Sequence, residues 1–231
     1  MFAYFKKKIC YVLLFIFLFF LCLLTIVVPV ITEEFFDIGE ETLNSIEKQY
    51  GKEARRHLIS WQNLIKNDTS TTEQEKISKV NHFFNQMQFV SDETHWGVED
   101  YWATPIEFLS SGMGDCEDFS LSKYFTLLAM GISEKKLNLT YVKALNLNQH
   151  HMVLTYFSMP GVEPLVLDNL TDAVLPASER PDLLPIYSFN GTGLWLAKQR
   201  GRGKLVGSSS RLKRWQDLLQ KMPQGLIDNN E

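Results

Sequence analysis

The chain has 231 residues, a formal net charge of −4, and 45% hydrophobic residues. This length suits one well-buried domain with an appendage, and the composition excludes collagen-like, disordered and disulfide-dense small proteins. The slight excess of acidic residues also argues against a nucleic-acid partner that is bound by neutralising phosphates.

The N-terminal segment differs in character from the rest of the chain. Lys6, Lys7 and Lys8 precede an uncharged apolar run over residues 9–31, which is long enough to cross a bilayer. Because positive charge flanks the cytoplasmic side of a span, residues 1–32 are predicted to be an N-terminal membrane anchor or uncleaved signal sequence. Residues 33–231 are then the exported domain.

A cleavable signal peptide is the alternative to an anchor. Secretory apolar regions run for about 7–15 residues and end in an A-x-A-like site. The apolar run here is longer and leaves through Val-Pro-Val-Ile-Thr-Glu-Glu. These two features favour the anchor.

The cysteines point to one residue in the exported part. Cys10 and Cys22 lie in or beside the apolar run, whereas Cys116 is alone in residues 33–231 and has no internal disulfide partner there. An unpaired thiol in an oxidising compartment is either buried and inert or used in chemistry.

Two helical regions are predicted before Cys116. Apolar residues at helical spacing over residues 37–66 indicate one or two amphipathic helices. A capping signal, Thr72 followed by Glu75, opens a further helix that runs to Met87. The segment 91–114 is rich in aromatic and glycine residues and is interpreted as a packed loop.

The next predicted helix begins at Cys116. Asp115 with Asp118 three residues later fits a helix N-cap, and apolar residues continue at helical spacing until Gly131. Free backbone N–H groups and the helix dipole stabilise a thiolate in the first turn. Cys116 is therefore a candidate nucleophile.

A base and an orienting carboxylate follow on predicted antiparallel strands. Residues 139–144, 151–157 and 164–167 are predicted as strands, with His151 opening the second and Asp168 following the third. Cysteine, histidine and aspartate in this order suit a nucleophile, a base and its orienting group. His150 would face the opposite side of the strand, and spacing alone does not decide between the two histidines.

The C-terminal part offers less chemistry. Residues 187–189 and 194–197 are possible strands, a basic glycine-rich loop follows over residues 198–204, and a short helix starts at Ser210. Pro223 is expected to end that helix.

Six sequence elements together resemble the bacterial transglutaminase-like cysteine proteinases, in particular the periplasmic LapG-type proteases that cleave biofilm adhesins. They are DYWATPIEFL, GDCEDF, KYFTLLAMGI, TYVKAL, HMVLTY and PLVLDNL, in this order over residues 80–200. The resemblance implies an α+β fold, transglutaminase-like or papain-like, with an N-terminal helical part packed on a small antiparallel sheet and the nucleophile at a helix N-terminus. It implies Cys116 as nucleophile, His151 rather than His150 as base, and Asp168 as the orienting group. By a weaker carry-over, Trp102 would assist at the oxyanion.

The resemblance also implies a calcium ion beside the nucleophile, with Asp115 and Glu117 as the matching positions. A physical reason supports a cation there, because Asp115, Glu117 and Asp118 would otherwise raise the pKa of the thiol. Carboxylates without a His/Cys cluster favour Ca²⁺ over zinc. The alternative is that the acids only cap the helix.

The implied substrate is the N-terminal region of a large cell-surface adhesin. The implied partner is an inner-membrane cyclic-di-GMP receptor whose periplasmic domain sequesters the protease. Two other functions stay open: a transglutaminase that uses the same triad with an amine acceptor, and a calcium-dependent binding module with an inactive triad.

Overall fold

The computed structural model describes residues 37–196 and 203–222. The chain divides into two units, residues 1–35 and 36–231, and the following description concerns the second. The predicted anchor, its boundary near residue 32, Pro223 and most of the basic loop lie outside the described residues. Within the described ranges, no helix is both long and apolar enough to cross a bilayer.

Three helices open the domain: α2 (Glu40–Tyr50), α3 (Lys52–Lys66) and α4 (Glu73–Phe84). Gly51 separates the first two and has a φ of 94°, a left-handed conformation that glycine adopts without a steric cost. The helical pattern over residues 37–66 is therefore two helices. The predicted capping box of Thr72 and Glu75 is formed, and α4 ends slightly before the predicted Met87.

The segment 91–114 differs from the packed loop that was predicted. It contains α5 (Asp92–His95) and α6 (Pro105–Ser111). Thr104 and Glu107 form a capping box around Pro105, and Gly112 ends α6 in a left-handed conformation with a φ of 72°. The prediction is wrong here because the aromatic and glycine content of the segment obscured these helix signals.

The domain's main sheet is antiparallel. Its strands are β3 (Leu137–Ala144), β4 (Gln149–Tyr156), β5 (Leu165–Leu167), β6 (Leu175–Pro176), β7 (Leu183–Phe189), β8 (Leu194–Leu196) and β9 (Lys204–Gly207). The order across the sheet is β6-β5-β4-β3-β7-β8-β9. A small parallel pair joins β1 (Gln88–Phe89) to β2 (Met113–Gly114). The predicted strands are present with shifted bounds. β4 begins at Gln149 and not at His151, because its pairing with β3 extends to Gln149. Lys204, expected in a basic loop, begins β9.

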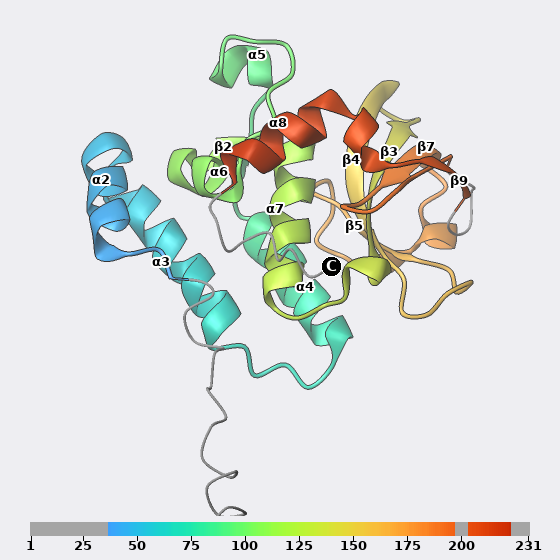
Figure 1. Ribbon diagram of the computed structural model, residues 1–231, viewed down its shortest axis with the longest axis horizontal. Coiled ribbons are helices and arrows are strands. Elements are labelled where there is room, and N and C mark those ends of the chain that lie inside the picture. The colour runs from blue at the N-terminus through green and yellow to red at the C-terminus, as the bar shows by residue number, and fades with distance from the viewer. Residues whose placement is uncertain (1–36, 197–202, 223–231) are drawn as a thin grey trace, which may run out of the picture. The chain divides into compact units, whose positions relative to one another are not determined.

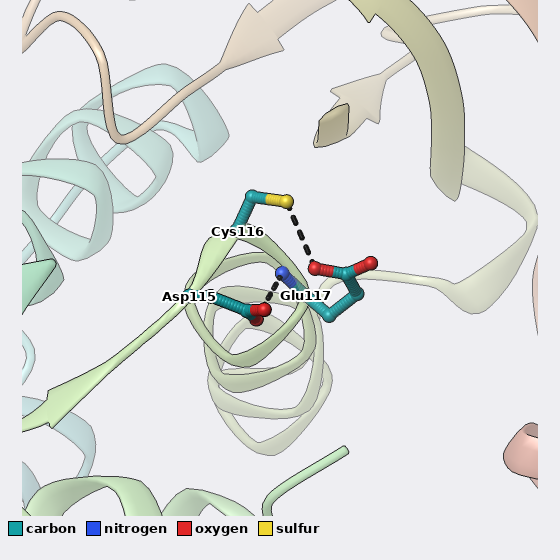
Figure 2. Close-up of side chains that lie close together, drawn as sticks. All are labelled: Asp115, Cys116 and Glu117. Atoms are coloured by element: carbon teal, nitrogen blue, oxygen red, sulfur yellow. Dashed lines mark hydrogen bonds between the residues drawn. The ribbon is translucent and has the colours of Figure 1, made fainter. Parts of the chain in front are cut away.

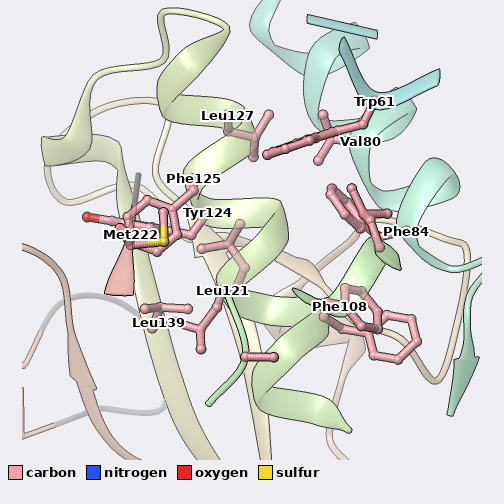
Figure 3. Close-up of a cluster of buried hydrophobic side chains, with 14 of the residues drawn as sticks. Trp61, Val80, Phe84, Phe108, Leu121, Tyr124, Phe125, Leu127, Leu139 and Met222 are labelled. Atoms are coloured by element: carbon pink, nitrogen blue, oxygen red, sulfur yellow. The ribbon is translucent and has the colours of Figure 1, made fainter. Parts of the chain in front are cut away.

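The helix α7 (Cys116–Ala129) is the centre of the hydrophobic core. It runs between the other helices and the sheet (Figure 1). Figure 3 shows Trp61, Val80, Phe84 and Phe108 on one side of α7 and Leu139 of β3 on another. Since most of its faces are buried, α7 holds its first residue in a fixed position relative to the sheet.

The C-terminal helix α8 (Lys213–Lys221) completes the core. Its Trp215 stacks on Phe125 of α7, with ring centroids 5.7 Å apart, and makes an edge contact with Phe189 of β7 at 5.5 Å. The short helix predicted from Ser210 is thus confirmed, with a start at Lys213.

Candidate active site

Cys116 is the first residue of α7 and is partly buried. Asp115 is the N-cap, and its backbone N–H and the Asp118 side chain close the capping box. Gly114 lets the chain approach this helix start, because a Cβ at Gly114 would lie 2.4 Å from Asp118 Oδ2 and 2.7 Å from Phe108 Cδ2. The predicted setting of Cys116 is therefore present.

The start of α7 contacts β4 along an edge of that strand that β5 leaves free. β5 pairs only with residues 154–156 of β4. Ser120, one turn after Cys116, donates a hydrogen bond to the carbonyl of Met152 at 3.0 Å. The backbone N–H of Met152 lies close enough to the Cys116 thiol to lower its pKa. The thiol therefore lies beside the residue that follows His151.

His151 and Asp168 form a buried pair. The imidazole Nε2 and Asp168 Oδ1 are 2.7 Å apart, and the side chains are 4% and 0% exposed. The backbone N–H of Leu170 also donates to Oδ1, at 3.1 Å. Burial alone would raise the pKa of Asp168, but the hydrogen bond and charge of His151 outweigh it and lower this pKa to about 2. Asp168 is therefore an ionised acceptor at neutral pH.

His150 lies in different surroundings. It is exposed, and its ring stacks on Tyr141 with centroids 5.2 Å apart. The Asp168 carboxylate pairs with His151 and not with His150. The structure therefore distinguishes the two histidines, which spacing alone could not do.

The thiol of Cys116 donates a hydrogen bond to Glu117 Oε2 at 2.8 Å (Figure 2). Within the described residues, no hydrogen bond joins it to His151. Burial raises the pKa of Cys116, and the negative charges of Glu117 and Asp115 raise it further. The structure thus pairs His151 with Asp168, whereas the Cys116 thiol contacts an acid of its own helix turn.

Four carboxylates gather around this turn. Ligand atoms of Asp115, Cys116 and Glu117 lie within 4.8 Å of one another, as do those of Asp92, Asp115 and Asp118. Asp92 is 3% exposed, and its Oδ1 has no hydrogen-bond partner within the described residues. A buried carboxylate oxygen without a partner is costly unless a cation meets it. These oxygen donors suit a hard divalent cation such as Ca²⁺.

The pKa values of these acids reflect their crowding. Burial and the charges of Glu117 and Asp118 raise the pKa of Asp115 to about 10. Burial also raises the pKa of Asp118 to about 8, although the backbone N–H of Ala103 stabilises its charge. Like charges held this close favour protonation or a bound cation.

Two residues at the site have no local sequence signal. Asp92 reaches the cluster from α5, and Arg180 donates a hydrogen bond from Nη2 to Asp168 Oδ2 at 2.7 Å. Both arrive through long-range packing, so spacing around Cys116 or His151 could not reveal them. Asp118 was expected as a capping acid and as one of the acids that raise the pKa of the thiol, but not as a calcium ligand.

Trp102, the weaker candidate for assisting at the oxyanion, is packed in the core. It is 8% exposed and stacks on Phe189 with ring centroids 5.9 Å apart. Its carbonyl accepts a hydrogen bond from Lys221 of α8 at 2.7 Å.

Comparisons with known proteins identify the family of this chain. The family model of bacterial transglutaminase-like cysteine proteinases matches residues 50–196. Legionella pneumophila LapG is 42% identical, with a TM-score of 0.68, over 79% of this chain and 97% of that one. Its calcium-bound structure is 43% identical, with a TM-score of 0.67, over 79% and 98%. An EGTA-treated structure of LapG has the same values as the first. Curated protein sequences gave no match.

The expected fold class is confirmed by these similarities. The helices and the antiparallel sheet match the transglutaminase-like fold of LapG. The resemblance noted from the six sequence elements is confirmed as well.

Proposed function

Because the chain belongs to the bacterial transglutaminase-like cysteine proteinase family, we propose that it is a calcium-dependent cysteine endopeptidase with Cys116, His151 and Asp168 as its catalytic triad. The observation that carries this proposal is the buried hydrogen bond between His151 and Asp168, beside a helix that starts at Cys116. Family membership supports the reaction class, and this geometry supports the assignment of roles.

The roles follow from the imidazole's two nitrogens. Asp168 accepts from Nε2–H, so the lone pair of the neutral ring lies on Nδ1. In the proposed reaction Nδ1 takes the thiol proton, and Sγ attacks the carbonyl carbon of the scissile peptide bond. The imidazolium then protonates the leaving amine, which leaves a thioester on Cys116. His151 next deprotonates a water that hydrolyses the thioester and restores the thiol.

Charge on the attacked carbonyl oxygen needs hydrogen-bond donors. We assign this role to backbone N–H groups at the start of α7, including that of Cys116, where the helix dipole also favours negative charge. These N–H groups lie at the first turn of α7 because Asp115 caps the helix.

We propose that Asp92, Asp115, Glu117 and Asp118 hold the calcium ion. The support is the set of oxygen donors, the partnerless Asp92 Oδ1 and the calcium-bound structure of LapG. Calcium, when bound, supplies positive charge that offsets the carboxylates raising the pKa of Cys116.

The substrate, partner and location rest on the family resemblance and the N-terminal sequence. We propose cleavage of the N-terminal region of a large biofilm adhesin at a small-residue site, controlled by an inner-membrane cyclic-di-GMP receptor. We further propose a periplasmic location with residues 9–31 as the anchor, since lysines precede this run and acids follow it.

The test compares new protein N-termini on cells that carry the wild-type chain, Cys116→Ala or the control Cys22→Ala. Terminal-amine labelling followed by mass spectrometry should find one large surface protein cut near its N-terminus by wild type and control. Cys116→Ala should give no such terminus. Identical termini in all three strains would refute the endopeptidase.

Two further measurements separate the alternative functions. Incorporation of a labelled primary amine into protein, dependent on Cys116, would indicate a transglutaminase. If iodoacetamide modifies the Cys116 thiol no faster with calcium than without it, the protein is a binding module. This alternative is tested because the thiol donates a hydrogen bond to Glu117 and not to His151.

A further inference from the structure

Both carboxylate oxygens of Asp168 are held, and by different parts of the chain. Oδ1 accepts hydrogen bonds from His151 Nε2 at 2.7 Å and from the Leu170 N–H at 3.1 Å. Oδ2 accepts from Arg180 Nη2 at 2.7 Å. The carboxylate therefore cannot rotate without breaking a charge-assisted hydrogen bond.

Arg180 is itself fixed in place. It follows the short 3-10 helix η2 (Ala177–Glu179), and its side chain is 7% exposed. Its Nε and Nη2 donate to the two carboxylate oxygens of Asp182 at 3.0 and 2.8 Å. This two-point contact orients the planar guanidinium, which a lysine ammonium could not match.

The charges form an ordered row of His151, Asp168, Arg180 and Asp182. One further charged group lies near Asp168: the fully buried Lys123 on α7, whose charge is favoured by Asp168 and by Asp172 in the loop after β5. Arg180 disfavours a proton on His151, and Asp182 favours one. The two residues therefore act on the imidazole with opposite signs.

We propose that Arg180 is a positioning residue of the active site, which holds the Asp168 carboxylate so that His151 keeps its proton on Nε2 and presents Nδ1 to Cys116. This inference rests on the proposed peptidase function. Burial of an ion pair is seldom a net gain in stability, and Arg180 Nη1 has no partner within the described residues. Stability alone is therefore a poor account of a buried arginine at this place.

The experiment measures the protonation of His151 directly. Full-length chain with ¹³C- and ¹⁵N-labelled histidine is studied by NMR as wild type, Arg180→Gln, Arg180→Lys and Asp182→Asn. The His151→Gln variant identifies its signals among those of the five histidines. Cleavage of the surface protein found by N-terminal labelling is measured on the same samples.

Opposite shifts are expected. Arg180→Gln should raise the imidazole's titration midpoint and increase the fraction with the proton on Nδ1, while Asp182→Asn should lower the midpoint, each by about half a pH unit or more. Arg180→Lys should keep the titration midpoint of the imidazole close to wild type, because lysine keeps the positive charge. It should restore the wild-type tautomer less well, because lysine lacks the two-point contact of the planar guanidinium. Cleavage should fall about tenfold or more in Arg180→Gln.

Shifts of the same sign, or an unchanged tautomer in Arg180→Gln, would overturn the proposal. If Arg180→Gln does not fold, Asp182→Asn still decides, since Asp182 is 28% exposed and an unmoved midpoint there also refutes it. Wild-type chain that cleaves nothing would refute the peptidase function, while the NMR shifts would still test the Arg180 contact.

Discussion

His150 and His151 are adjacent in β4 but differ in burial and in partners. Only His151 touches Asp168, and His150 stacks on Tyr141 at the surface. With calcium present, His151→Ala should slow alkylation of Cys116 about tenfold or more, because the thiolate loses its imidazolium partner. Substrate cleavage should fall by about 10²–10⁴-fold.

His150→Ala is the matched control and should keep both rates close to wild type. Iodoacetamide modification, quantified by mass spectrometry of the peptide that contains Cys116, avoids interference from Cys10 and Cys22. Equal losses in the two variants would mean that β4 is disturbed and that the assignment of His151 as base is wrong.

Asp92 is the acid whose role in the cluster rests on packing alone. Its pKa is raised by burial and by the charges of Glu117 and Asp100, against the hydrogen bond from the Tyr101 N–H. Asp92→Asn should therefore weaken calcium binding about tenfold or more and yet stabilise the calcium-free protein by about 1 kcal/mol. Calorimetric titration with CaCl₂ and thermal unfolding in EGTA measure these two effects.

Asp217→Asn, a neutralised acid on the exposed face of α8, is the control and should change neither quantity. Unaltered calcium affinity in Asp92→Asn would remove this residue from the proposed ligands.

At the scale of elements, the turn from β2 into α7 depends on Gly114. An added Cβ would overlap both Asp118 and Phe108, so Gly114→Ala should cost about 1–3 kcal/mol of unfolding free energy and displace Cys116 from β4. Gly39→Ala is the matched control, because nothing lies within 4 Å of a Cβ there. Urea unfolding of both variants tests this, and equal stability would contradict the close approach.

Elements with strong local signals were predictable from the sequence. The capping residues and apolar spacing of α7 predict its start at Cys116, and alternation predicts the β3–β4 hairpin that carries His151. The pairing of His151 with Asp168 was suggested by chain order and the family resemblance. The positions of Asp92 and Arg180 could not be predicted, because each depends on how separate elements pack.

At the scale of the whole molecule, Asp168 should make stability fall at acid pH. Its pKa is about 2 in the folded state and about 3.9 in an unfolded chain. A depressed carboxylate pKa stabilises the fold above the unfolded value, and this contribution is lost as pH falls from about 4 to 2. Urea unfolding at several pH values should show a loss on the order of 2 kcal/mol, which Asp168→Asn should abolish. If the loss of unfolding free energy persists in Asp168→Asn, other acids cause it.

The acidic cluster should act with the opposite sign. Asp115 and Asp118 have folded pKa values of about 10 and about 8, both above the unfolded value of about 3.9. A raised pKa gives a contribution that is complete below about pH 4 and is lost as pH rises towards the folded values. In EGTA, unfolding free energy should therefore decline from about pH 4 to pH 8.

Calcium should reverse this decline, because a bound cation favours the ionised carboxylates and stabilises only the folded state. The measurement is urea unfolding of the full-length chain at pH 5 and pH 8, each in EGTA and in excess CaCl₂. Stabilisation by calcium should be larger at pH 8, where fewer protons compete for the carboxylates. Asp118→Asn should flatten the decline in EGTA and reduce the calcium effect together. An equal calcium effect at both pH values would show that these carboxylates are not its ligands, and the proposed activation of Cys116 by calcium would then lose its structural basis.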